Sequence, residues 1–140
     1  PQMFEDFVAP RIKRCADLAH SYNCKLILHT DGNIRDIIPR LVELGVDVLD
    51  PLQPEAEHMD PVKIKKEFGN ELVLRGGIST QKTLSRGSKE DVIEEVRRTI
   101  EILGEGGGYI CSPGHPVLQS DIPIENIITM YETAYKYGFY

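Results

Sequence analysis

Residues 25–50, KLILHTDGNIRDIIPRLVELGVDVLD, contain the pattern that decides the fold. The short apolar run 25–29 ends in polar residues, which is typical of a parallel strand buried on both faces. Apolar residues then recur at helical spacing over 34–44, and a second short apolar run follows at 46–50. The stretch therefore predicts a strand, a helix and a second strand in succession.

Three residues set the limits of this predicted helix. Asn33 is the expected N-cap, and Gly45 is the expected stop because glycine readily adopts the left-handed conformation that ends helices. Pro39 lies inside the helical pattern, where it removes a hydrogen-bond donor. We therefore expect Pro39 to kink the second turn or to move the helix start.

The same alternation of short apolar runs and helical spacing continues to the end of the chain. Further strands are predicted at 72–75 and 109–111, and residues 1–23 are predicted to form a helix that precedes the first strand. Other helices are expected at 60–68, at 88–103 and from Pro123 onward, the last with Ile124, Ile127, Ile128, Tyr131, Ala134 and Tyr135 facing inward. Four strands alternating with helices predict an α/β fold with a parallel sheet.

Two architectures fit this alternation. A doubly wound open sheet is one, but the G-x-G-x-x-G phosphate motif is missing after the first strand. The other is a (β/α)8 barrel of the TIM type, of which four βα units make a half-barrel. Half a barrel leaves two strand edges unpaired. We expect a missing N-terminal half or a second copy of this chain, in a homodimer, to complete it.

Composition excludes several classes of protein. The 140 residues are 41% hydrophobic and 27% charged, as in an ordinary globular domain. Sixteen Lys and Arg against 22 Asp and Glu give a net charge of −6, and no basic run suits nucleic acid or an anionic membrane. No apolar stretch approaches the roughly 20 residues of a membrane span. A cytoplasmic location is expected.

Polar residues follow each predicted strand, where such barrels hold their active sites. The four strand ends read His29-Thr30-Asp31-Gly32, Asp50-Pro51-Leu52-Gln53, Arg75-Gly76-Gly77-Ile78-Ser79 and Ser112-Pro113-Gly114-His115. His29, Asp31 and His115 are the candidate catalytic residues, and together they are a candidate set of ligands for zinc or another divalent metal. The alternative is that Asp31 caps a helix while His29 bonds a backbone carbonyl.

The second and third strand ends supply candidate substrate-binding residues, namely Gln53, Arg75, Gly76 and Gly77. Arg75 can clamp a carboxylate or a phosphate, or it can form an ion pair with Asp50 or Asp47 on the neighbouring strand. The two glycines allow a ligand to approach the backbone closely, or they form a tight turn.

Taken together, these segments resemble the C-terminal half of the uroporphyrinogen decarboxylase superfamily, over roughly residues 24–140 and in the same order. The residues that carry the resemblance are His29-Thr30-Asp31-Gly32-Asn33, Gly45 to Gln53, Leu74-Arg75-Gly76-Gly77-Ile78, Gly106 to Ile110, Pro113-Gly114-His115 and Asp121 to Ile127. The resemblance implies a (β/α)8 barrel in which this chain supplies the last four strands.

True uroporphyrinogen decarboxylases remove carboxyl groups from acetate side chains of a tetrapyrrole without a metal or an organic cofactor. The resemblance implies that His115 holds a pyrrole substituent or moves a proton. Important basic and acidic residues of that family precede the matched part, so the isolated half is expected to be inactive.

The corrinoid-linked methyltransferases of the same superfamily provide an alternative. They bind zinc through a His-x-Cys-Gly segment and a later cysteine, and they take methyl groups from a corrinoid protein or a small methylated substrate. Here Asp31 replaces the cysteine, and His115 stands near the position of the second sulfur. Oxygen and nitrogen are harder metal ligands than sulfur. Two further alternatives are a phosphate-binding half-barrel, using Gly76, Gly77 and the turn at Gly114, and a non-catalytic assembly module.

Overall fold

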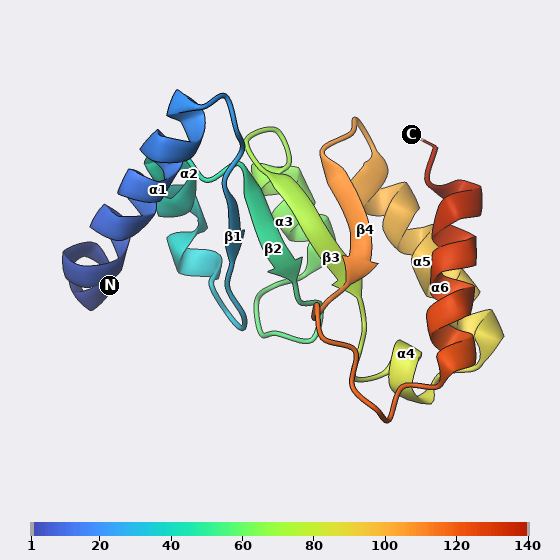
Figure 1. The fold of residues 1–140 in the computed structure, drawn as a ribbon. Coiled ribbons are helices and arrows are strands. Elements are labelled where there is room, and N and C mark those ends of the chain that lie inside the picture. The colour runs from blue at the N-terminus through green and yellow to red at the C-terminus, as the bar shows by residue number, and fades with distance from the viewer. Residues whose placement is uncertain (1, 140) are drawn as a thin grey trace.

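Four parallel strands form a single sheet in the chain order β1–β2–β3–β4 (Figure 1). The computed structural model describes residues 2–139. The strands are β1 (Ile27–His29), β2 (Val48–Leu52), β3 (Val73–Ile78) and β4 (Tyr109–Pro113). Consecutive pairing of parallel strands through crossover helices is the arrangement of successive βα units in a barrel. The predicted half-barrel is confirmed.

Helices connect the strands and flank the sheet. A π-helical turn η1 (Phe4–Val8) leads into α1 (Ala9–Ser21), and a 3-10 turn η2 (Arg35–Ile37) leads into α2 (Ile38–Leu44). The others are α3 (Pro61–Phe68), α4 (Thr83–Arg86), α5 (Lys89–Gly104) and α6 (Ile124–Tyr137). The α5 helix begins with a reciprocal capping box between Ser88 and Asp91, which satisfies two backbone donors at its start.

Pro39 moves the start of α2, as the sequence predicts. Pro39 lies in the first turn of α2, where its missing N–H costs no helical hydrogen bond, and the helix ends at Gly45 with φ 91°. Asn33 does not cap α2, so that prediction was wrong. Its side chain accepts a hydrogen bond from the Arg35 amide at 3.3 Å, ahead of the 3-10 turn.

The hydrophobic core lies between the sheet and the helices on one of its faces. Leu49, Leu74 and Tyr109 are paired or neighbouring strand residues in this core, packed with helical residues such as Leu41 and Val96. Alternate strand residues point to the other face, which we call the open face; it carries His29, Asp50 and Arg75. Figure 1 looks toward this face, with α3 behind the sheet.

The prediction that β1 is buried on both faces was wrong. Ile27 is 52% exposed, and His29 is also exposed. The physical reason is that β1 is an edge strand of the sheet and that, within residues 2–139, no helix covers its open face (Figure 1). Ile110 on the other edge strand, β4, is likewise exposed.

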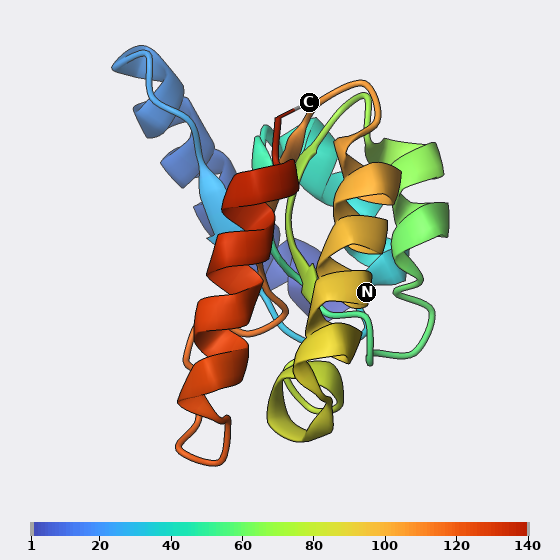
Figure 2. The same ribbon diagram turned by 90° about the vertical axis from the view of Figure 1, so that its right-hand side faces the viewer.

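The predicted inward face of the last helix was also largely wrong. Figure 2 shows α6 beside α5, and α6 buries Asn126, Thr129, Met130 and Thr133. Four apolar residues expected to face inward are instead exposed: Ile124, Ile128, Tyr131 and Tyr135. The amide of Asn126 donates to the carbonyls of Leu84 and Gly87 at 3.0 and 2.9 Å. These bonds fix which side of the helix packs inward.

No helix within residues 2–139 combines the length and the apolar character that crossing a bilayer requires.

Candidate functional site

A hydrogen-bonded group of charged side chains lies on the open face, where His29 at the carboxyl end of β1 meets Asp50 within β2 and Arg75 within β3. His29 pairs in register with Asp50, and its Nδ1 lies 3.0 Å from Asp50 Oδ2. The other oxygen, Asp50 Oδ1, accepts a hydrogen bond from Arg75 Nη1 at 2.7 Å. Asp50 is only 5% exposed. Two partners therefore fix the orientation of a buried carboxylate.

His29 lies between two carboxylates. Its Nε2 lies 3.3 Å from Asp31 Oδ2, while its Nδ1 faces Asp50. The hydrogen bond to Asp50 raises the pKa of His29 above its ordinary 6.5, and the charge of Asp31 raises it further. The protonated imidazole is therefore favoured, and its ring is oriented from both sides.

Arg75 forms the inter-strand ion pair that the sequence offered as one of its two roles. Its partner is Asp50 and not Asp47. The side chain of Arg75 remains 33% exposed at the open face. Its role as a substrate clamp stays a prediction, and a ligand there would meet a guanidinium already oriented by Asp50.

Asp47 belongs to a separate group at the opposite ends of the strands. It receives hydrogen bonds from His20, Lys25 and the Leu26 amide at 2.7 to 2.9 Å. Burial alone would raise the pKa of Asp47, but these three bonds lower it to about 2. Because the group joins α1 to the start of β2, away from the carboxyl ends of the strands, we assign it a structural role.

His115 lines a second part of the site, a polar cavity of about 250 Å³ at the carboxyl ends of the strands. The cavity is bounded by Gln53, Thr80, Gln81, Ser85, Arg86, His115, Val117, Gln119, Asp121 and Ile122. The Val117 amide lies 3.2 Å from Nδ1 of His115 and donates to it. An imidazole, a guanidinium and several amides thus converge on one small volume.

Gln53 links the two parts of the site. Its Oε1 accepts a hydrogen bond from the Gly32 amide at 2.6 Å, which holds the loop that follows His29. Gln53 also lines the cavity that contains His115. Gln53, a predicted substrate-binding residue, thus lies beside the loops that follow β1 and β4.

The predicted metal-binding group of His29, Asp31 and His115 does not form. Within residues 2–139, no three His, Cys, Asp or Glu side chains are arranged to hold a metal ion. Both nitrogens of His29 already face carboxylates, while Nδ1 of His115 faces the backbone of Val117. These three side chains are therefore not arranged as the zinc ligands that the resemblance to methyltransferases would require.

Gly76 and Gly77 lie where the chain packs closely, because a side chain at either position would meet other protein atoms. A Cβ on Gly76 would lie 2.7 Å from the Leu52 nitrogen, and one on Gly77 would lie 3.0 Å from side-chain atoms of Leu103 and Thr99. Both residues have positive φ, which favours glycine. Both residues lie within β3, where Gly76 pairs with Cys111 and Gly77 with Ser112 of β4, so they do not form the predicted tight turn. Their role in substrate binding stays a prediction.

Sequence reasoning missed a group of residues around Ser79. The Ser79 amide donates to Glu95 Oε1 at 2.9 Å, and its hydroxyl donates to Glu55 Oε1. Arg86 and Ser85, from the short helix α4, were also missed as cavity residues. A serine directly after a strand gave a weak signal, but Glu95 looked like any polar residue of an amphipathic helix.

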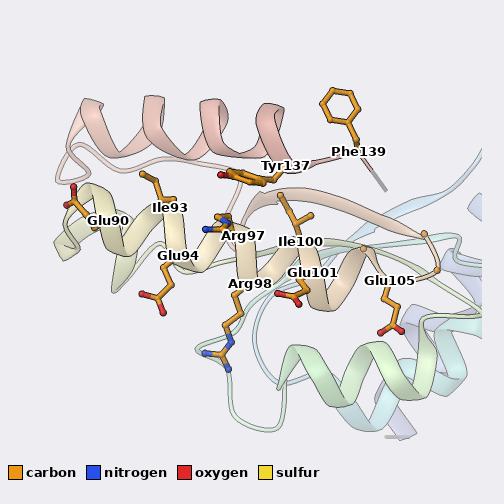
Figure 3. A pocket seen from close by; sticks show the side chains of 13 residues that line it. Glu90, Ile93, Glu94, Arg97, Arg98, Ile100, Glu101, Glu105, Tyr137 and Phe139 are labelled. Carbon is orange, nitrogen blue, oxygen red and sulfur yellow. The ribbon is translucent and has the colours of Figure 1, made fainter.

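A larger groove lies on the helix side, away from the predicted residues. It has a volume of about 1200 Å³ and runs along α5 to the end of α6, as Figure 3 shows. The Arg97 guanidinium lies 4.8 Å from the centre of the Tyr137 ring, and Glu90, Glu94, Glu101 and Glu105 also line the groove. The groove extends from Glu90, at the start of α5, to Gly106 and Gly107, which precede β4.

Comparison with known proteins assigns the chain to a family. The family model described as "Uroporphyrinogen decarboxylase (URO-D)" matches residues 1–137. The chain belongs to the uroporphyrinogen decarboxylase family. A curated uroporphyrinogen decarboxylase from a Nitratiruptor species is 29% identical to it over 104 residues, which make up 74% of this chain and 27% of that protein.

A solved structure confirms the fold of this family member. It is a methyltransferase from Methanosarcina mazei, similar with a TM-score of 0.76 and 22% identity over 99% of this chain and 38% of the other. At this identity the likeness concerns the fold alone. The chain thus spans about a quarter of the curated relative and less than half of the structural one.

Proposed function

We propose that this chain supplies the strand-end residues of an enzyme that decarboxylates carboxylated tetrapyrroles, with His29 as the proton donor. The observation that carries the proposal is the position of His29 between Asp50 and Asp31 on the open face of the sheet. The hydrogen bond to Asp50 raises the pKa of His29 and so favours the protonated ring that a general acid needs. Membership of the uroporphyrinogen decarboxylase family supports the choice of reaction.

The proposed reaction needs one proton for each carboxyl group that it removes. The bond between the side-chain carbon and its carboxylate breaks, carbon dioxide leaves, and a proton is added to the remaining carbon. His29 supplies a proton and regains it from water. Asp50 keeps the ring oriented and stabilises its charged form, so the donor is positioned before the substrate arrives.

The polar cavity beside His115 provides a binding place for a carboxylate of the substrate. Arg86 offers a positive charge, and Gln53, Gln81 and Gln119 offer amide donors around the same volume. Charge-assisted hydrogen bonds from arginine to carboxylate are among the stronger polar contacts in proteins. His115 completes this wall, and its proposed role is binding rather than metal ligation.

Further βα units are proposed to close the barrel across the two open edges. Ile27 on β1 and Ile110 on β4 are both exposed, and α6 exposes Ile128 and Tyr131. The relatives are longer than this chain, which favours the remaining units of one barrel over a second copy. Closure would turn the open face into a water-poor interior around His29.

Closure can be tested by sedimentation of the 140-residue chain alone and with a separately produced N-terminal half of a family member. A one-to-one complex supports closure of the barrel by further βα units. A stable homodimer that does not bind the added half contradicts it. The Ile128→Glu variant should weaken the complex, because it places a charge on the exposed apolar face of α6. The Lys136→Glu variant, at an exposed charged position of the same helix, is the control.

The reaction can be tested with the protein as its own gene encodes it. We expect release of carbon dioxide from a tetrapyrrole with acetate side chains, and a fall of about 100-fold or more in the His29→Gln variant. The matched control is His58→Gln, because His58 is exposed and its ion-pair partner is the adjacent Glu57. Undiminished decarboxylation by His29→Gln would contradict the role of His29. Methyl transfer from a methylcorrinoid to a thiol, without decarboxylation, would overturn the assigned reaction in favour of the methyltransferase alternative.

A further inference from the structure

Three chain segments meet at Ser79, the residue after β3. Glu55, in the loop after β2, accepts a hydrogen bond from the Ser79 hydroxyl. Glu95, on α5, accepts a hydrogen bond from the Ser79 amide at 2.9 Å. Ser79 is 5% exposed. Two carboxylates from different elements therefore hold one buried residue by its side chain and its backbone.

This contact positions one wall of the polar cavity. The Ser79 hydroxyl accepts a hydrogen bond from the Lys82 amide at 3.1 Å, and the Gln81 amide lies 3.4 Å from Glu55 Oε1. The same loop carries Thr80 and Gln81 into the lining of the cavity beside His115. A change in how Ser79 is held would therefore move the cavity wall.

One oxygen of this group has no partner. Glu95 Oε2 is buried and makes no hydrogen bond within residues 2–139, and a buried charge without a partner is unfavourable. Burial raises the pKa of Glu95, and the charge of Glu55 raises it further. The Thr83 hydroxyl, the Ser79 amide and the charge of Arg98 oppose this shift without cancelling it.

The other charges near Glu95 come from three segments and nearly balance. Lys82, Arg86, Asp91, Glu94 and Arg98 line a neighbouring hollow together with Glu95. Three are cations and two are anions, and among the cations the charge of Arg98 is the one that favours ionised Glu95. Glu55 remains the carboxylate that shares a hydrogen-bonding residue with Glu95.

We propose that Glu95 is a proton-sensitive latch that holds the loop 79–82 against α5 and so sets the shape of the cavity beside His115. When Glu95 gains a proton, the Ser79 amide loses a charged acceptor, but the unpaired buried charge and its repulsion with Glu55 also disappear. Because burial has the largest effect on Glu95, protonation favours the closed loop over a loop that opens and exposes Glu95 to water. The latch therefore tightens as pH falls and loosens as pH rises. This inference does not depend on which ligand or reaction the cavity serves.

Hydrogen exchange at the Ser79 amide tests the latch without any assay of activity. The quantity is the protection factor, corrected for intrinsic exchange, at pH 4.5 and pH 7.5. We expect it to be roughly threefold or more higher at the lower pH, because a group whose pKa is raised in the closed state stabilises that state most when it is protonated. Equal protection at both values of pH would overturn the proposal, and this comparison needs no variant.

Three variants separate the latch from other effects of pH. Glu95→Gln keeps an acceptor for Ser79 but has no charge, so its protection should be high and independent of pH. Glu95→Ala lacks the acceptor and should lose protection at both values of pH. Glu94→Gln, at the exposed neighbouring position, should behave as the unmodified chain does. A pH dependence in Glu95→Gln equal to that of the unmodified chain would contradict the assignment to Glu95.

Discussion

The Nδ1 atom of His29 lies 3.0 Å from Oδ2 of Asp50, across the pairing of β1 with β2. The contact joins an exposed imidazole to a buried carboxylate. Because Arg75 occupies the other oxygen, Asp50 cannot turn away from His29 without losing an ion pair. One buried side chain thus joins three neighbouring strands through its contacts with His29 and Arg75.

Replacing Asp50 should destabilise the chain. Asp50→Asn removes the charge that pairs with His29 and Arg75, and the amide can place only one acceptor oxygen between the two donors. We expect a loss of about 1–3 kcal/mol in the free energy of unfolding, measured by urea denaturation at pH 7. Asp31→Asn, at an exposed position, should cost clearly less. Equal losses would show that burial of Asp50 does not matter.

The hydrogen bonds to Asp47 should account for part of the decrease in the free energy of unfolding at acid pH. Its pKa of about 2 lies below the ordinary 3.8 of an aspartate. A lowered pKa in the folded state adds stability above the unfolded value, and that stability is lost as pH falls from about 4 to about 2. Asp47→Asn should therefore cost roughly 1–2 kcal/mol at pH 6 and almost nothing at pH 2. A cost that does not change with pH would contradict the ionic origin.

Gly76, within β3, and Gly32, in the loop after β1, should respond differently to alanine. Gly76→Ala forces a Cβ to 2.7 Å from backbone of Leu52, whereas Gly32→Ala meets nothing within 4 Å. Both have positive φ, which alone costs alanine roughly 1–2 kcal/mol. We expect Gly76→Ala to lower the melting temperature much more than Gly32→Ala. Similar shifts would mean that β2 can move aside.

Local pattern predicted the strands and helices well because each βα unit buries apolar residues in a regular order. It failed where burial depends on a neighbour in space. The spacing of Ile124, Ile128 and Tyr131 identifies an apolar stripe on α6, but it does not say what covers the stripe. Similarly, β1 has the composition of a central strand and lies at an edge.

The candidate site was predictable in position but not in its pairing. Strand ends identified His29, Asp31 and Gln53 at one rim, because parallel strands end at the same edge of a sheet. From the sequence, Arg75 could form an ion pair with either Asp50 or Asp47. The register of the strands places it beside Asp50. The contact of Ser79 with Glu95 spans 16 residues and depends on how α5 lies on the sheet.

Titration of the His29 ring by NMR tests most directly whether two carboxylates keep it protonated. We predict a pKa above 6.5 for His29, a large decrease toward 6.5 in Asp50→Asn and a smaller decrease in Asp31→Asn. Because the folded pKa is raised, the stabilisation from this charge should be complete below pH 6.5 and vanish as pH rises through the folded pKa. A His29 that titrates at or below 6.5, or whose pKa does not change in Asp50→Asn, would contradict the account.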